Sequence, residues 1–252
     1  MIVIILSAGS ATRLGELTKN LPKGLLDING KTLVERQIES FSSNNIEKII
    51  LIVGPNRDKF HLKNVDYIFD ESHDQHEQLG SLFSAKKFIQ DEVIISFGDV
   101  LVEKNVFEQI MNSSFEIGLA VDLDWKQNYI ERSMHPESEA DLVRIESNMI
   151  TKIQKRLVQN NTEKIGEFLG IMKLNKNGAK TFVETYDKLL ESSNGKFQTA
   201  NSFKKAFLTD FIQELIDRQV SIHPIIINGN WFEIDTSQDL DNSREKIKKW
   251  NK

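Results

Sequence analysis

An apolar run, Met1 to Leu6, leads directly into a loop of small residues that extends to Gly15. Small side chains let a ligand approach the backbone, and glycine also permits a positive φ. Successive N–H groups can then form an anion-binding concavity, and Arg13 and Lys23 add positive charge. The pattern therefore predicts a buried strand followed by a polyphosphate-binding loop. This loop lacks the Gly-Lys-Ser/Thr ending of a P-loop and the Gly-x-Gly-x-x-Gly of a dinucleotide fold, so the sequence disfavours both of these common phosphate-binding loops.

The first half of the chain alternates strand and helix patterns, which is typical of a mainly parallel sheet covered by helices. Its predicted strands are rich in β-branched and aromatic residues, as are strands that are buried on both faces. These strands are Ile2–Leu6, Lys48–Val53, Val65–Phe69 and Val93–Phe97, and the clearest helix between them is Thr32–Asn44.

From Phe115 onward, strand patterns connected by polar loops indicate mixed or antiparallel pairing. We expect strands at 117–122, 140–145, 150–154 and 167–174, helices at 175–191 and 202–218, strands at 222–227 and 231–234, and a last helix at 237–250. The chain is thus predicted to be a single domain, 1–252. Residues 1–115 and 222–252 would form its core, and 116–221 an elaboration.

Composition limits the kinds of protein that this chain can be. Its 252 residues are enough for one large α/β domain, and a net charge of −5 argues against a general nucleic-acid binder. The absence of cysteine excludes disulfides, thiolate catalysis and cysteine metal sites. No apolar run approaches the roughly 20 residues that span a bilayer. We therefore expect a cytoplasmic protein that binds neither nucleic acid nor membrane.

Two segments each deliver a carboxylate to the end of a predicted strand. Asp99 follows the strand at 93–97, at the carboxyl edge where open α/β sheets bind ligands. Near the C-terminus, alternation places Glu233 and Asp235 on the same side of a strand. Mg²⁺ favours such carboxylates together with phosphate oxygens. Each segment alone also fits an ordinary turn or helix cap, but combined with the phosphate loop they predict a nucleotide–metal site.

Two other clusters leave alternatives open. His73 and His76 lie in an acidic loop that fits a solvated surface better than a zinc site, which would need further ligands. Trp125, Tyr129 and Trp231 form either a cage for a quaternary ammonium group or ordinary packing.

Several motifs occur in one order along the chain: Leu6-Ser7-Ala8-Gly9-Ser10-Ala11-Thr12-Arg13, Leu21-Pro22-Lys23, Gly30-Lys31-Thr32-Leu33, Gly98-Asp99-Val100 and the segment 231–239. Together they resemble the nucleotidyltransferase family of sugar-phosphate pyrophosphorylases. The segments 121–132, 139–143, 153–155, 166–171 and 207–210 are similar to its branch of phosphocholine and 2-aminoethylphosphonate cytidylyltransferases. This resemblance covers almost the whole chain. It implies a Rossmann-like α/β fold of the GT-A-like nucleotidyltransferase type, with a mixed, mainly parallel sheet flanked by helices and a smaller acceptor-binding lobe or lid at 116–221.

The resemblance also implies a reaction: transfer of a cytidylyl group from CTP to a small phosphorylated or phosphonylated acceptor, with Mg²⁺ as cofactor and release of pyrophosphate. Catalysis would then depend on Arg13 and Lys23, and metal binding on Asp99 and Asp235. Nucleotide contacts are expected from Leu6, Ala8, Gly9, Ser10, Arg13, Lys23, Gly80, Ser81 and Asp99, and acceptor contacts from Asp122, Lys155 and Glu167.

The sequence departs from that branch at 77–82, where many members have an Asn-rich segment and this chain has Glu77-Gln78-Leu79-Gly80-Ser81-Leu82. Since this region is expected near the base and the acceptor, the identity of the acceptor stays open. Two alternatives also remain. One is a sugar-1-phosphate nucleotidylyltransferase that uses UTP, dTTP or GTP, and the other is a non-catalytic nucleotide-binding regulatory protein. A homodimer formed through the strands of the lobe is compatible with the sequence.

Overall fold

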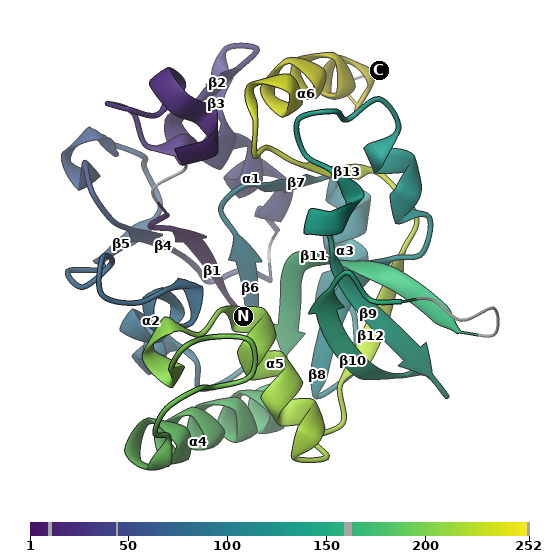
Figure 1. The fold of residues 1–252 in the computed structure, drawn as a ribbon. Coiled ribbons are helices and arrows are strands. Elements are labelled where there is room, and N and C mark those ends of the chain that lie inside the picture. The colour runs from purple at the N-terminus through teal and green to yellow at the C-terminus, as the bar shows by residue number, and fades with distance from the viewer. Residues whose placement is uncertain (10–11, 44, 159–162, 251–252) are drawn as a thin grey trace.

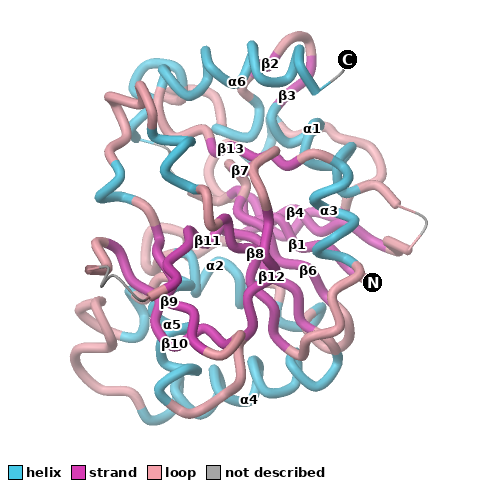
Figure 2. Tube along the Cα trace, turned by 90° about the vertical axis from the view of Figure 1, so that its right-hand side faces the viewer, coloured by secondary structure: helices cyan, strands magenta, loops and turns pink. Residues whose placement is uncertain are grey.

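The computed structural model describes residues 1–9, 12–43, 45–158 and 163–250. Within these residues a nine-stranded mixed sheet crosses the molecule in the order β10-β9-β11-β6-β1-β4-β5, with β8 paired to β11 and β12 paired to β8. Helices cover both faces of this sheet, and α6 lies at the opposite end of the molecule from α4 (Figures 1 and 2). The strands are β1 (Ile2–Ser7), β2 (Asp27–Ile28), β3 (Lys31–Thr32), β4 (Lys48–Val53), β5 (Asp66–Phe69), β6 (Val93–Phe97), β7 (Val100–Val102), β8 (Ile117–Asp122), β9 (Asp141–Glu146), β10 (Met149–Lys155), β11 (Lys164–Leu174), β12 (His223–Ile227) and β13 (Trp231–Glu233). The helices are α1 (Leu33–Phe41), α2 (Gln78–Ser84), α3 (Lys104–Met111), α4 (Lys176–Ser192), α5 (Leu208–Asp217) and α6 (Ser237–Trp250).

The first half of the sheet is parallel, as predicted. β1 pairs in parallel with both β4 and β6, and β4 pairs in parallel with β5. Alternate residues of β1 enter two different cores. Ile4 and Leu6 pack with residues of α2, α4 and α5, whereas Val3 and Ile5 pack with residues of α1 and α3. Burial on both faces is why these strands read as continuous apolar runs.

The second half pairs mainly in antiparallel fashion, apart from the parallel pair of β8 and β12, which confirms the expectation of mixed or antiparallel pairing. β9 pairs with β10 and β11, and β11 also pairs with β8 and β6. The register of β11 against β8 shifts between Phe168 and Met172, where Gly170 has a φ of +75°. A side chain at Gly170 would collide with the ring of Phe97. Because β11 pairs with β6, the strands between residues 117 and 174 continue the sheet of the first half.

The helices largely follow the predictions, with two differences. The predicted helix at 202–218 is interrupted, since α5 begins only at Leu208 after a short 3-10 turn at Phe203–Lys205. Asp210 fixes this start by accepting the N–H groups of Phe207 and Thr199. The second difference is that α3 is a helix that we did not predict. The short strand β7, which precedes it, was not predicted either. Among the described residues, no helix combines the length and the apolar character needed to cross a membrane.

Candidate active site

Two carboxylates from distant parts of the sequence meet just beyond the carboxyl end of β6. The N–H of Gly98 donates to the carbonyl of Leu6 at 2.8 Å, and a side chain at Gly98 would collide with that carbonyl, so glycine is needed for this approach. β13 pairs with β7 in antiparallel fashion, and the N–H of Ile234 donates to the carbonyl of Asp99 at 3.0 Å. This two-stranded ribbon brings Asp235 beside Asp99.

Lys23 joins these two carboxylates. Its Nζ donates to Asp99 Oδ2 at 2.9 Å and to Asp235 Oδ1 at 2.7 Å. Burial alone lowers the pKa of Lys23, but the negative charges of Asp99 and Asp235 outweigh burial and raise that pKa above its ordinary value. In turn, the charge and hydrogen bond of Lys23 overcome the effect of burial and lower the pKa of Asp235. The lysine is therefore held as a cation between two anions.

Arg13 approaches the same carboxylate from the phosphate loop. Its Nη2 lies 3.1 Å from Asp235 Oδ2, and its side chain is 55% exposed. Its Nη1 lies 3.5 Å from His135 Nδ1. The exposed guanidinium is therefore anchored at one edge and open to a ligand at the other. The structure thus brings together all four of the predicted catalytic and metal residues.

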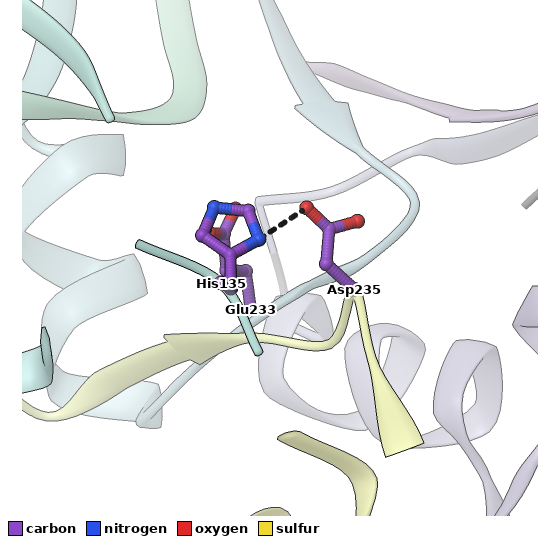
Figure 3. A group of neighbouring side chains, drawn as sticks. All are labelled: His135, Glu233 and Asp235. Atoms are coloured by element: carbon purple, nitrogen blue, oxygen red, sulfur yellow. Dashed lines mark ion pairs between the residues drawn. The ribbon is translucent and has the colours of Figure 1, made fainter. Parts of the chain in front are cut away.

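His135, Glu233 and Asp235 form a compact group around this point (Figure 3). The imidazole lies between the carboxylates, with Nδ1 3.2 Å from Asp235 and Nε2 3.4 Å from Glu233. Burial and the charge of Arg132 lower the pKa of His135 to about 4, so the ring is neutral near pH 7. Burial and the charge of Asp235 raise the pKa of Glu233 to about 7. The prediction that Glu233 and Asp235 share one side is met, since both approach the same ring.

Their donor atoms lie within 4.8 Å of one another, and an imidazole with two carboxylates is a donor set that divalent cations accept. Here, however, the carboxylates already have cationic partners. Arg13 contacts Asp235, and Arg132 contacts Glu233 at 3.1 Å. These contacts favour a network that holds Asp235 in place.

Asp239 holds the backbone around Asp235. Its Oδ2 accepts the N–H groups of Asp235 and Thr236 at 3.0 and 2.8 Å, and the hydroxyl of Thr236 at 2.8 Å. The Thr236 hydroxyl accepts the N–H of Asp239 in return, which completes a capping box at the start of α6. Oδ1 of Asp239 accepts a hydrogen bond from Arg132 Nε at 2.6 Å, and both side chains are almost fully buried. Arg132 thereby connects the loop after β8 to the segment that carries Asp235.

Arg13, Lys23, Asp99 and Asp235 line a cleft of about 590 Å³. Four more of the predicted nucleotide contacts lie in its walls, together with Ser7: Leu6, Ala8, Gly9 and Ser81. The lining also includes Phe97, Phe207 and residues of the loop and helix at 73–78. Ser10, another predicted contact, lies outside the described residues.

The acidic loop before α2 differs from both of its sequence interpretations. Asp70 is 2% exposed, and it accepts hydrogen bonds from Ser81 Oγ at 2.6 Å and from Ser72 N–H at 3.2 Å. His76 Nε2 lies 3.0 Å from Oδ1 of Asp70, the same oxygen that accepts the N–H of Ser72. Asp70 and His76 are thus part of a buried network, and the expectation of a solvated loop is wrong for them. Gly80 packs against His76 and lines a neighbouring cavity, so its place gives no support to contact with the base.

Two of the predicted acceptor residues are buried in the lobe. Asp122 is 1% exposed, and its oxygens accept from Trp231 Nε1 at 2.7 Å and from Asp124 N–H at 2.9 Å. Both oxygens of Asp122 therefore already accept hydrogen bonds inside the protein, and its role in acceptor binding stays a prediction. Glu167 Oε1 accepts from the Tyr129 hydroxyl at 2.5 Å, while its Oε2 is buried without a partner.

The aromatic residues of this lobe pack in its interior. Trp125 and Tyr129 are 6% and 7% exposed, and their rings meet edge to face at 5.6 Å. Trp231 is also buried and bonded to Asp122. Of the two sequence interpretations, ordinary packing therefore describes these aromatic residues.

Lys155 lies at the end of β10 with 47% of its side chain exposed, and it pairs with Glu139 at 3.0 Å. The hydrogen bond and charge of Lys155 lower the pKa of Glu139, and His135 and Arg13 contribute in the same direction. The partner of Lys155 across the strand pair is Asp141, whose pKa burial raises to about 6.

The residues present fit a divalent cation bound to a nucleotide. Oδ1 of Asp99 is buried without a hydrogen-bond partner, and a buried carboxylate oxygen of this kind requires compensation. Asp99 and Asp235 lie close together, because both contact the Nζ of Lys23. Two carboxylates close together, with room left for phosphate and water, are what Mg²⁺ accepts.

Sequence reasoning did not identify His135, Arg132, Asp239 and Asp70 as parts of the site. Their partners lie far away in the sequence or, for Asp70, across a loop that reads as polar. A weak signal was present for Asp239, because a threonine three residues before an acidic residue is typical of a helix start. No local pattern marks the other three.

Comparison with known proteins adds to this geometry. The sequence model of the MobA-like NTP transferase domain matches residues 3–130. CTP:phosphoglutamine cytidylyltransferase of Campylobacter jejuni is 26% identical over 258 residues, covering 98% of this chain and 100% of that protein. Choline-phosphate cytidylyltransferase of Streptococcus pneumoniae is 35% identical over 118 residues, which are 45% of this chain and 51% of the relative.

The fold is also that of a solved structure, an inositol-1-phosphate CTP transferase from T. maritima. It superposes with a TM-score of 0.75 at 19% identity and covers 100% of this chain and 96% of that one. The bifunctional protein GlmU of Methanococcus vannielii is 28% identical, over 95% of this chain and 53% of the relative, so the chain spans about half the length of that protein.

Proposed function

Because this chain belongs to the MobA-like NTP transferase family, we propose that it transfers the cytidylyl group of CTP to a small acceptor with a phosphate or phosphonate group, with Mg²⁺ as cofactor. The observation that carries the proposal is the meeting of Arg13, Lys23, Asp99 and Asp235 at the end of β6, beside the small-residue loop. Three relatives with different acceptors in their names share CTP. CTP is therefore the nucleotide that we assign.

The reaction forms a bond between an acceptor oxygen and the α-phosphorus of CTP, and breaks the bond from that phosphorus to the bridging oxygen of pyrophosphate. The acceptor oxygen is already anionic, so no side chain has to remove a proton. Catalysis then consists of positioning and charge neutralisation. Both tasks suit cations that are fixed in place before the substrates bind.

Arg13 neutralises the charge that develops on the leaving pyrophosphate. Its planar guanidinium keeps its charge and can bind two phosphate oxygens at once, and its exposed edge faces the cleft. Lys23 contacts the α-phosphate and the incoming anion from its position between the carboxylates. Asp99 and Asp235 would hold Mg²⁺, which draws the two anionic partners together and withdraws charge from the phosphate.

The acceptor side of the site carries several carboxylates. Glu167 has an unpartnered buried oxygen, and Asp141 and Glu139 lie near Lys155. A lysine beside acidic groups suits an acceptor with a phosphate or phosphonate at one end and a positively charged group at the other, as phosphocholine and 2-aminoethylphosphonate have. Lys155 is assigned to the phosphate and Glu167 to the opposite end.

The test is pyrophosphate release from CTP, UTP, dTTP, GTP and ATP, each combined with phosphocholine, 2-aminoethylphosphonate, phosphoglutamine, inositol 1-phosphate and glucose 1-phosphate. Release with CTP and a small phosphate or phosphonate, and its loss on chelation of Mg²⁺, is the expected result. Release only with glucose 1-phosphate and UTP, dTTP or GTP would replace the proposal with a sugar-nucleotide activity. No release from any pair, with tight binding of a nucleotide, would indicate a regulatory protein.

A further inference from the structure

The hydroxyl group of Ser81 lines the cleft, and a buried carboxylate behind it fixes its direction. Ser81 Oγ lies 2.6 Å from Asp70 Oδ2, and Ser81 and Asp70 are 8% and 2% exposed. Ser81 begins the second half of α2, and the same residue is part of the cleft wall that includes Ala8 and Gly9. One face of this hydroxyl thus meets protein, and the other meets the nucleotide site.

The carboxylate of Asp70 fixes the direction in which the Ser81 hydroxyl donates its hydrogen. The other oxygen of Asp70 faces the N–H of Ser72 at 3.2 Å and Nε2 of His76 at 3.0 Å. The N–H of Ser72 can only donate, and Nε2 of His76 can donate as well, while Nδ1 of that ring lies 3.1 Å from the carbonyl oxygen of Glu77. An ionised carboxylate only accepts hydrogen bonds, and a hydroxyl has a single hydrogen. Ser81 must use that hydrogen on Asp70, so that it can offer only lone pairs to the cleft.

We propose that Asp70 is a positioning residue that makes Ser81 a hydrogen-bond acceptor in the nucleotide site, and that this selects a base with an amino group, as in cytosine, against one with a carbonyl in the same place, as in uracil. The inference rests on the proposed cytidylyl transfer. The 4-amino group of cytosine donates to Ser81 Oγ. The 4-carbonyl of uracil would face the lone pairs of that oxygen, and such a mismatch is a strong means of discrimination.

The substitution Asp70→Asn reverses this polarity with little change in shape. The position of Oδ1 faces the N–H of Ser72, which can only donate, so the amide oxygen takes that position. The amide nitrogen then occupies the position of Oδ2 and donates to Ser81 Oγ. The hydrogen of Ser81 is released to the cleft, where it can donate to the 4-carbonyl of uracil.

The experiment compares kcat/KM for CTP and UTP in the wild-type protein, Asp70→Asn and Ser81→Ala. Glu71→Gln is the matched control, since it makes the same change of charge at an exposed neighbour. We expect the CTP:UTP ratio to fall by about tenfold to 100-fold in Asp70→Asn, the range for a polar group left facing the wrong partner. It should also fall in Ser81→Ala, and change by no more than about twofold in Glu71→Gln.

A purely structural role for Asp70 predicts a different result, since a loosened α2 would weaken CTP and UTP equally. An unchanged CTP:UTP ratio in Asp70→Asn, with transfer from CTP intact in the wild type, overturns this inference and leaves the proposed function in place. Should the wild type transfer nothing from CTP, the proposed function fails, and calorimetric dissociation constants of CTP and UTP test Asp70 separately. Thermal melting identifies a variant that does not fold, in which case Ser81→Ala decides: an unchanged ratio there also overturns the inference.

Discussion

Arg132 offers the sharpest test of how the site is held together. The substitution Arg132→Met keeps an unbranched apolar chain that can still pack on the ring of Tyr129, over which the guanidinium lies at 5.2 Å. It removes the hydrogen bond of 2.6 Å to Asp239 and the ion pair of 3.1 Å with Glu233. Both carboxylates then lose a cationic partner, and Asp239 loses it in a place that water hardly reaches.

The expected cost follows from that burial. The side chains of Arg132 and Asp239 are 5% and 4% exposed, so solvent cannot replace the lost cation. Breaking a buried ion pair by removal of one partner costs about 3–5 kcal/mol of unfolding free energy. For a domain of this size that lowers the melting temperature by about 6–20 °C. We also expect kcat to fall by about 10- to 100-fold, because Asp239 holds the backbone of Asp235 and a small displacement of a catalytic group is costly.

The assay is urea and thermal unfolding of wild type, Arg132→Met, Asp239→Asn and the double variant. In such a cycle the contact should appear as a coupling energy of about 1–3 kcal/mol. Arg244→Met is the matched control, since Arg244 also pairs with an aspartate of α6, at 2.8 Å, but with both partners well exposed. Its cost should be less than about 1 kcal/mol.

Two results would refute the reasoning. One is a destabilisation by Arg132→Met no larger than that by Arg244→Met, which would mean that the buried pair contributes no more than a surface pair. The other is additive behaviour of the Arg132 and Asp239 variants. A fall in stability without any change in kcat would show that Asp235 keeps its position without this support.

Three further predictions concern the chemistry and the pH dependence. Asp99→Asn should lower the rate of Mg²⁺-dependent pyrophosphate release by about 100-fold or more, and unchanged turnover at saturating Mg²⁺ would remove Asp99 from the metal site. Lys155→Gln should raise the KM for the acceptor by about tenfold or more while that for CTP changes little; equal effects on both would argue against its role. Burial raises the pKa of Asp141 to about 6, so the stability it contributes is present below its unfolded pKa and lost as the pH rises through about 6. Asp141→Asn should accordingly melt higher than wild type above pH 6, with the difference vanishing near pH 4, and a difference that does not vary with pH would contradict this.

The parts of this fold that sequence revealed are those whose cause is local. β1, β4 and β6 are buried on both faces, so nearly every residue had to be apolar, and their runs were visible. β7 is too short to carry a pattern of its own, and it exists because β13 pairs with it. α3 did carry a usable signal, since Val106, Phe107, Ile110 and Met111 are its buried residues and recur at helical spacing.

The site shows the same division. Arg13, Lys23, Asp99 and Asp235 lie in motifs, and the structure brings them together. Asp70 was misjudged because a loop rich in charged residues usually faces solvent, and only the fold shows Ser72, His76 and Ser81 converging on its carboxylate. His135 could not be found, since its partners are defined by the ribbon that carries Glu233 and Asp235.

The arrangement assigns the separate tasks of the proposed reaction to separate elements that meet at one residue. The loop after β1 supplies Arg13, the middle of α2 supplies Ser81 for the base, and the lobe supplies Lys155 for the acceptor. Asp235 contacts Lys23, Arg13 and His135 directly, and Arg132 supports it through Asp239. His135 and Arg132 come from the same segment, between β8 and β9, and that segment leads to Glu139 and Lys155. A change of acceptor-binding residues can therefore alter the position of Asp235 as well as acceptor affinity, whereas a change at Asp70 affects the base alone. Substitution of Lys155, in the lobe, should accordingly have a large effect on kcat, and substitution of Asp70 should not.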